Sequence, residues 1–105
     1  MAVGQNQPQV INGATITGRG VKSVLNITAA TVIKAVAGRI CNVSVVVAGS
    51  APGSINDAAT TGAVAAANEV VVVPNTVGVY AIDMPTANGI VVVPGTGQTL
   101  AVSYN

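Results

Sequence analysis

The side chains that most often do chemistry in proteins are scarce in this chain. It has no histidine, the commonest general base and metal ligand, and its 105 residues include only three acids, Asp57, Glu69 and Asp83. Two carboxylates can in principle work as an acid and base pair. Asp57 and Glu69 fall in or beside an irregular stretch, however, and Asp83 falls at the end of a strand-like run. These positions favour solvation of turns and strand ends, so the sequence predicts no catalytic residue and no enzyme.

Cofactor and metal motifs are missing as well. A hard cation could recruit Asp57 together with loop carbonyls, but no alternating acidic loop of the calcium-binding kind surrounds it. The glycine-rich pieces GRG (residues 18–20) and GTG (residues 95–97) lack the lysine and the following helix of a phosphate loop. Cys41 is the only cysteine and stands in an apolar run, which is typical of a small buried hydrophobe. The sequence therefore predicts no bound cofactor and no metal.

Charge is also scarce. Charged residues make up 7% of the chain, against about 25% in an ordinary soluble domain, and the net charge is +1. A protein with so few charges must stay soluble through Ser, Thr, Asn and Gly on its surface, or must have much of that surface covered by other subunits. We expect the second. The basic residues form no stripe, and Tyr80 and Tyr104 are the only aromatic residues. We therefore expect no binding of nucleic acid and no attraction to an anionic membrane.

A repeat near the end of the chain organises the predicted fold. VVVPNT at residues 71–76 recurs as VVVPGT at residues 91–96, and each copy continues into a run where large apolar residues alternate with small or polar ones. A β-branched run, a proline-containing turn and an alternating run predict a β-hairpin, present here twice. Asn88 and Gly89 between the copies predict a tight turn.

Alternation predicts which residues of the strands face the core. Further strands are expected in residues 21–28, 30–36 and 38–49, with a brief one at residues 54–56 inside the irregular stretch 49–62. The positions expected on the core side are Leu25, Ile27, Cys41, Val43, Val45, Val47, Tyr80, Ile82, Met84, Leu100, Val102 and Tyr104. The two tyrosines are expected at the core margin, with their hydroxyls reaching water or backbone. The opposite side of the longest strand carries Ile40, Asn42, Ser44 and Val46, a mixture that predicts a face half covered by a partner or loop.

Short strands with regular Gly and Pro punctuation and no sustained helical period predict an all-β fold. We expect a single antiparallel β-sandwich, jelly-roll-like, over residues 21–105. AVAAAN at residues 63–68 is too short for a stable helix and is expected to be loop or one helical turn. Residues 1–20 are polar with isolated aliphatics and predict an extended N-terminal arm that orders on a neighbouring molecule. The stretch MAVGQNQPQ carries no secretion signal.

The order of these pieces resembles small virion proteins encoded in the structural modules of tailed bacteriophages. The resemblance covers residues 31–104, and its most specific parts are GRICNVSV (residues 38–45), the Asp57 that follows SIN, and GIVVVPGTGQTLAVSY (residues 89–104). It implies a β-sandwich or jelly-roll module that attaches to the virion, often as trimers that decorate or cement the capsid. Since these motifs are strand and turn residues, the resemblance implies no catalytic, cofactor-binding or metal-binding residues.

On these grounds we expect a capsid decoration or cement protein on the exterior of the capsid. Its expected partner is the major capsid protein, whose subunits it would bridge and stabilise, and it is expected to form a homo-oligomer, with a trimer favoured. The alternative is a phage tail or fibre component, or an adhesin-type binding module that engages a host receptor. The expected contact surfaces are the arm before Val21, residues 49–62 and the mixed face of residues 39–47.

Overall fold

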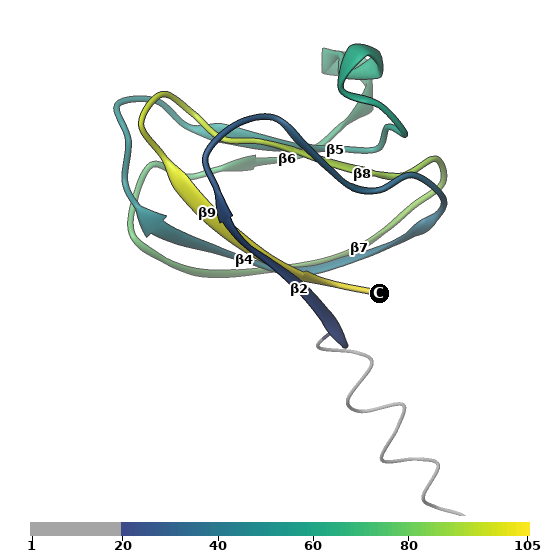
Figure 1. Cartoon of the computed structure of the whole chain (residues 1–105), viewed down its shortest axis with the longest axis horizontal. Helices are drawn as coiled ribbons and strands as arrows, with labels where there is room; N and C mark the ends of the chain where they lie inside the picture. The colour runs from purple at the N-terminus through teal and green to yellow at the C-terminus, as the bar shows by residue number, and fades with distance from the viewer. Residues whose placement is uncertain (1–19) are drawn as a thin grey trace, which may run out of the picture.

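The computed structural model describes residues 20–105, which form two four-stranded antiparallel sheets packed face to face (Figure 1). One sheet has the strand order β2-β9-β4-β7 and the other has the order β3-β8-β5-β6. Each even-numbered strand is followed by a strand of the opposite sheet, which is the winding of an eight-stranded jelly roll. The predicted all-β sandwich is therefore confirmed, while the predicted arm lies outside the described residues except for Gly20.

The strands are short and the helices are single turns. The strands are β2 Lys22–Ile27, β3 Thr31–Lys34, β4 Gly38–Val47, β5 Gly53–Asn56, β6 Glu69–Val73, β7 Gly78–Thr86, β8 Ile90–Val93 and β9 Thr99–Tyr104. Two 3-10 helices, η1 Thr61–Ala63 and η2 Ala66–Asn68, lie between β5 and β6. The brief strand and the single helical turns match the predictions for this region. No helix in residues 20–105 is long and apolar enough to cross a membrane.

Aliphatic side chains from both sheets fill the space between them. The core cluster consists of Ile27, Ile40, Val43, Val45, Ile55, Val73, Ile90, Val92, Leu100 and Val102. Most are β-branched, so ordering them costs little rotamer entropy, and each fully buried one contributes roughly 1.5 to 3 kcal/mol. Tyr80 and Tyr104 pack at the margin of this cluster, and the Tyr80 hydroxyl donates to the Thr76 carbonyl at 2.8 Å. The predicted location of the tyrosines is confirmed.

The two copies of the repeat are not hairpins, and that prediction is wrong. β6 pairs with β5 and β7 pairs with β4, while β8 lies between β3 and β5 and β9 lies between β2 and β4. The turns that begin at Pro74 and Pro94 therefore lead from one sheet to the other. In β8, Ile90, Val91 and Val92 are all fully buried. Three consecutive buried residues need cover on both faces of the strand, and β3 and β5 supply the neighbours of β8 on both edges.

The turn predicted at Asn88 and Gly89 exists as a short connection, but it is not the turn of a β-hairpin. These residues connect β7 to β8, which belong to different sheets. Neither has the positive φ that the two central residues of a type I′ hairpin turn require. The connection is instead held by hydrogen bonds to Asp57.

Irregularities in the ladders overturn several predicted core positions. In β2 the pairing with β9 slips between Val24 and Ile27, where Asn26 has a φ of 57°. This slip leaves Ile27 buried but turns Leu25 outward, with 70% of its surface exposed. A single left-handed residue in a strand thus breaks the strict alternation on which the prediction for Leu25 depended.

The same effect changes β4 and β7. The ladder between these strands slips between Ile40 and Asn42, opposite Asp83, which has a φ of 52°. Ile40, predicted to face away from the core, is fully buried, and Met84 is 43% exposed rather than in the core. Val47 is also exposed, at 48%, because the β4–β9 ladder slips again between Val45 and Val47. Cys41, Val43 and Val45 of β4 and Leu100 and Val102 of β9 are buried as predicted, and Tyr104 is half-buried.

Candidate interaction surface

One broad side of the sandwich is formed by the sheet β2-β9-β4-β7 where it faces away from the core; we call this the outer face. Residues directly opposite each other in antiparallel strands point to the same side of a sheet, so the ladder aligns them in rows. One row is Ser23, Ser103, Asn42 and Ala81, and the next contains Ala101, Ser44 and Val79. None of these seven residues is charged, whereas Arg39 on β4 and Asp83 on β7 form an exposed ion pair further along the same sheet. The middle of the outer face is therefore an uncharged surface of small and aliphatic side chains.

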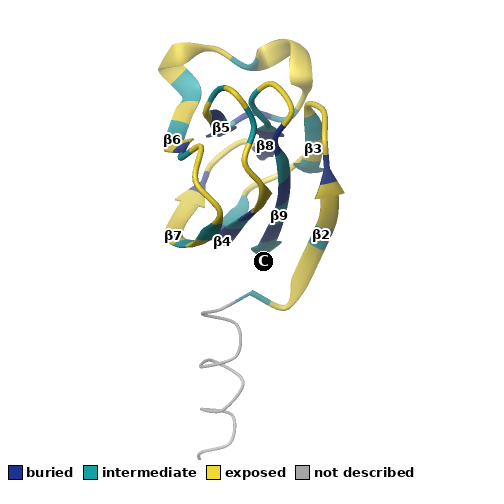
Figure 2. Cartoon of the chain, turned by 90° about the vertical axis from the view of Figure 1, so that its left-hand side faces the viewer, coloured by how far each residue is buried: buried dark blue, intermediate teal, exposed yellow. Residues whose placement is uncertain are grey.

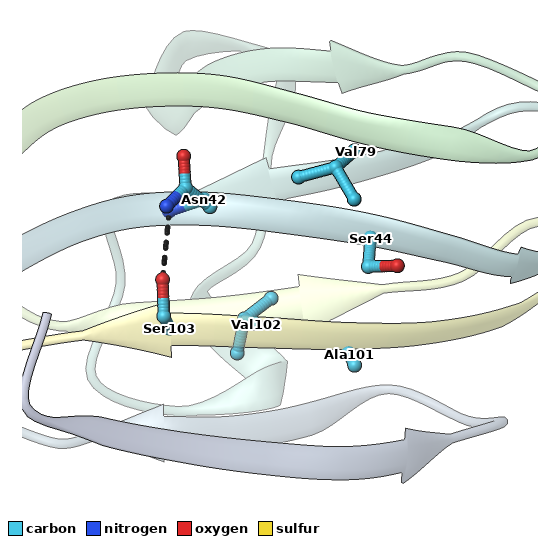
Figure 3. Close-up of a pocket in the computed structure, with 6 residues that line it drawn as sticks. All are labelled: Asn42, Ser44, Val79, Ala101, Val102 and Ser103. Atoms are coloured by element: carbon cyan, nitrogen blue, oxygen red, sulfur yellow. Dashed lines mark hydrogen bonds between the residues drawn. The ribbon is translucent and has the colours of Figure 1, made fainter. Parts of the chain in front are cut away.

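The outer face is hollowed along its middle. Its central strands, β9 and β4, carry the small residues Ala101, Ser103 and Ser44, whereas Leu25 on β2 and Val79 on β7 are 70% and 71% exposed at its two sides. A shallow hollow of about 200 Å³ lies along β9 and β4, with Val79 at one side, and we call it the trough. The residues that line it are Asn42, Ser44, Val79, Ala101, Val102 and Ser103 (Figure 3). A hollow with small side chains at its floor and an aliphatic rim suits a narrow, uncharged element of a partner.

Burial differs between the edges and the centre of this sheet. The edge strands β2 and β7 are exposed along most of their length, whereas β9 alternates between buried and half-buried residues (Figure 2). The floor of the trough is thus rigid, because its strands are paired on both sides and packed on the core. The rim belongs to the edge strand β7 and projects into solvent.

The outer side of the other sheet is partly covered by the chain itself. Asn56 and Val91 face each other across β5 and β8 and are buried, at 2% and 0% exposure. Residues 57–68, with η1 and η2, lie on that side of the sheet (Figure 1), and Ala58 at their start is buried too. This segment is tied back by the hydrogen bond from the Asp57 N–H to the Asn68 carbonyl, 2.7 Å long. Part of the irregular segment expected to contact a partner therefore packs within the molecule.

The structure gives the three acids separate places. Asp83 forms an ion pair with Arg39, 2.8 Å between the carboxylate and the guanidinium, but both side chains are substantially exposed, so the pair stabilises the fold little. Glu69 begins β6 and is exposed. Both carboxylate oxygens of Asp57 accept backbone hydrogen bonds. Among residues 20–105 no group of three or more His, Cys, Asp or Glu could hold a metal ion.

Cys41 is a poor candidate for a reactive thiol. Its side chain is buried, with 2% exposure. Burial raises the pKa of the Cys41 thiol, and the nearby Asp83 carboxylate raises it further. Because the thiolate is the nucleophile, a raised pKa lowers the reactivity of this group.

Asp57 fastens the connection between β7 and β8 to the end of β5. Its carboxylate accepts hydrogen bonds from the backbone N–H groups of Ala87 at 3.0 Å, Asn88 at 2.7 Å and Gly89 at 3.3 Å. These bonds hold the pKa of the Asp57 carboxyl below its ordinary value. The folded state therefore binds a proton at this site less readily than the unfolded chain does.

This linkage predicts a pH-dependent effect of Asp57→Asn. The contribution of Asp57 is fully present above the unfolded-state pKa of about 4 and is lost as the pH falls through the lower folded-state pKa. We expect Asp57→Asn to lower the free energy of unfolding by about 1 kcal/mol at pH 6, with the difference from the wild type vanishing toward pH 2. Urea unfolding at several pH values measures this, with Asp83→Asn as the exposed control. A difference that is constant with pH would contradict the assignment.

The sequence predicts a contact surface on the mixed face of residues 39–47, and this face supplies Asn42 and Ser44 to the trough. The exposed position of Leu25 on the edge strand β2 differs from the core position that the alternation predicts. The one available signal was Asn26, since Asn tolerates left-handed backbone conformations better than most residues.

Comparison of the chain with protein-family models, with curated proteins and with solved structures finds no match. Fold and surface together define a jelly-roll β-sandwich with one open face whose middle is uncharged.

Proposed function

We propose that this chain is a non-enzymatic structural protein of a tailed-bacteriophage virion, which decorates or cements the capsid by bridging major capsid protein subunits. The observation that carries the proposal is the outer face, whose middle is uncharged and whose edge strands expose Leu25 and Val79. A free monomer gains nothing from such a face, whereas a subunit laid against a shell buries it. This argument would hold for any large assembly, and the resemblance to small virion proteins, described from the sequence, points to a phage capsid.

In the proposed mechanism the protein stabilises the capsid through non-covalent contacts and catalyses no reaction. Each copy lies on the capsid exterior, with the outer face and the arm against neighbouring capsid subunits. The contact of one copy is small, but a homo-oligomer, a trimer by the resemblance, engages several subunits at once and gains avidity from multivalent placement. The jelly roll is a frequent architecture of capsid proteins, so the fold supports the proposed capsid role by analogy alone.

The rival function, receptor or glycan binding by a tail or fibre component, lacks a supporting feature in residues 20–105. Sugar binding commonly uses exposed aromatic rings as stacking platforms. Tyr80 and Tyr104 instead pack against the core cluster. We therefore keep the capsid role as the single proposal.

Rebinding to stripped particles tests the proposal. Particles from which the protein has been removed are expected to lose resistance to heat and low salt and to regain it when the protein is added back. Val79→Lys, which places a charge on the rim, is expected to weaken rebinding by at least tenfold, since a buried unpaired charge costs several kcal/mol. Val36→Lys is the matched control, because Val36 is similarly exposed, at 62%, but lies in the loop between β3 and β4.

Two results would overturn the capsid role. Stripped particles that withstand heat and low salt as well as intact ones would remove the cementing function. Density for the protein confined to the tail in an electron-microscopy map of the particle would move it away from the shell. Equal rebinding of Val79→Lys and Val36→Lys would show that the outer face is not the docking surface.

A further inference from the structure

We infer that the Asn88–Gly89 pair is a site of spontaneous deamidation that the Asp57 carboxylate protects while the protein is folded. The inference concerns a chemical modification of the chain itself. It needs no partner, so it stands or falls independently of the capsid role.

Deamidation requires a deprotonated backbone nitrogen next to an asparagine side chain. The Gly89 nitrogen loses its proton to water or hydroxide and attacks the Asn88 Cγ atom, the Cγ–Nδ2 bond breaks, and ammonia leaves. Water then opens the resulting succinimide to aspartate, by attack at Cγ, or to isoaspartate, by attack at the main-chain carbonyl carbon. The net change hydrolyses an amide to a carboxylate, without oxidation or reduction. A glycine after the asparagine favours ring closure, because no Cβ obstructs the approach of the two groups.

Asn88 and Gly89 differ in their exposure. Asn88 is the only asparagine of residues 20–105 that a glycine follows. It is exposed, so water reaches its amide, whereas Gly89 is buried. The reaction is therefore limited at the backbone nitrogen of Gly89 rather than at the side chain of Asn88.

The Asp57 carboxylate holds the Gly89 nitrogen in its protonated form. Its Oδ1 atom accepts the Gly89 N–H at 3.3 Å and the Asn88 N–H at 2.7 Å, while Oδ2 accepts the Ala87 N–H at 3.0 Å. Removing the proton from the Gly89 nitrogen would break one of these bonds and place a negative charge beside the carboxylate. Like charges at this separation repel, so the attacking anion forms less readily here than in the unfolded chain.

The backbone of Gly89 is also held in position. An added Cβ would collide with the Ala58 carbonyl oxygen and lie 2.6 Å from the Lys34 carbonyl oxygen. These two oxygens come from the segment after β5 and from the end of β3, so parts of the chain distant in sequence enclose Gly89. Turning the Gly89 nitrogen toward the Asn88 side chain requires this contact to open. Deamidation therefore follows the population of a locally open state, which the bonds to Asp57 keep small.

Reaction in the open state would be permanent. Either product places a second carboxylate beside Asp57, and isoaspartate also adds a methylene group to the main chain between β7 and β8. Repulsion between the two carboxylates and the altered backbone would prevent the bonds to Asp57 from re-forming as before. A brief opening of this connection would thus become a lasting loss of the contact that holds it.

Incubation of the full chain at neutral pH, followed by mass spectrometry of its peptides, tests the inference. Trypsin cleavage after Arg19 keeps the other Asn-Gly pair of the sequence, residues 12–13, in a separate peptide. We expect Asn88 to deamidate at least about tenfold more slowly in the folded protein than in urea. Asp57→Ala, which removes the carboxylate without adding an amide, is expected to abolish most of this protection. Equal rates in the folded wild type and Asp57→Ala would overturn the inference, and a slower rate in Asp57→Ala would make the carboxylate a base that promotes the reaction.

Two controls separate the contact at Asp57 from a general loss of stability. Asp83→Ala makes the same change at an exposed acid and is expected to leave the deamidation rate of Asn88 unchanged. Val45→Ala truncates a buried side chain at the opposite end of β7, beside Gly78, and is expected to lower global stability while changing the Asn88 rate by less than about twofold. A rise in Val45→Ala as large as that in Asp57→Ala would assign the reaction to global unfolding and contradict the role of Asp57.

Hydrogen exchange of the Gly89 amide, followed by NMR, gives a second reading without chemical damage. The Gly89 N–H of the wild type is expected to exchange at least about tenfold more slowly than in the unfolded chain, and Asp57→Ala is expected to remove most of that protection. Gly62, an exposed glycine in η1, is expected to exchange at the same rate in both proteins. A Gly89 amide that already exchanges at the unfolded-chain rate in the wild type would overturn the inference.

Discussion

Replacing Gly95 with alanine is expected to lower the free energy of unfolding by at least about 3 kcal/mol. Gly95 lies in the turn between β8 and β9, where an added Cβ would collide with the Ala51 carbonyl oxygen and lie 2.6 Å from the Pro52 carbonyl oxygen. Both obstacles are backbone, so no side chain can rotate away to make room. The turn and the segment before β5 would have to separate, and this separation would reach Gln98, which accepts a hydrogen bond from the Gly95 N–H at 3.0 Å.

Gly62→Ala is the matched control for this experiment. A Cβ on Gly62 meets nothing within 4 Å. The same chemical change is therefore expected to leave stability within about 0.5 kcal/mol of the wild type, apart from the small effect of glycine on the unfolded chain. Chemical unfolding at neutral pH compares the two variants. Similar losses in both would show that the close contact at Gly95 does not exist in solution.

Gln98→Ala is expected to cost about 2 to 4 kcal/mol of stability. Gln98 is 1% exposed, and its amide joins the two turns of the repeat: the Nε2 group donates to the Pro74 carbonyl at 2.9 Å while Oε1 accepts from Gly95. Alanine would leave the Pro74 carbonyl and the Gly95 N–H without this partner and would open a cavity beside them. Unfilled buried hydrogen-bonding groups account for much of the expected loss.

Two further variants separate the hydrogen bonds of Gln98 from its volume. Gln98→Glu keeps the shape but replaces the donor by a carboxylate, so we expect strong destabilisation at pH 7. Burial raises the pKa of a carboxyl group, and a protonated one can donate to the Pro74 carbonyl, so stability should recover as the pH falls. Asn75→Ala, at an exposed position of the other turn, should change stability by less than about 0.5 kcal/mol. A pH-independent loss in Gln98→Glu would contradict the assigned role of the amide.

Much of the local structure could be predicted from the sequence, because its causes are local. The alternation in the last strand places Leu100 and Val102 in the core, and the same rule holds for Val43 and Val45 in β4. The β-branched runs and the Gly and Pro punctuation predict an all-β fold, and the shortness of the alanine-rich piece excludes a long helix. The candidate surface was only half predicted, through Asn42 and Ser44.

The failures share one physical cause, since they depend on which strands pair and in which register. A valine run, a proline turn and an alternating run have the same local pattern in a hairpin and in a connection between two sheets. The repeat therefore could not show that β6 and β7 belong to different sheets, nor that β8 and β9 do. Left-handed conformations at Asn26 and Asp83 shift the ladders, and these shifts move Leu25 to the surface and Ile40 into the core.

By itself, the sequence determined which reactive side chains the protein has and the class of its fold. The chain has few charged residues and no histidine, and its short strands of small aliphatic residues must pack on one another to be buried. Only the tertiary structure decided where the surplus aliphatics lie. It partly covered one sheet's outer side with residues 57–68 and left the other side open, with the trough along β9 and β4. The physical reason is that the face a strand residue occupies follows from its cross-strand partners, and these are distant in the chain.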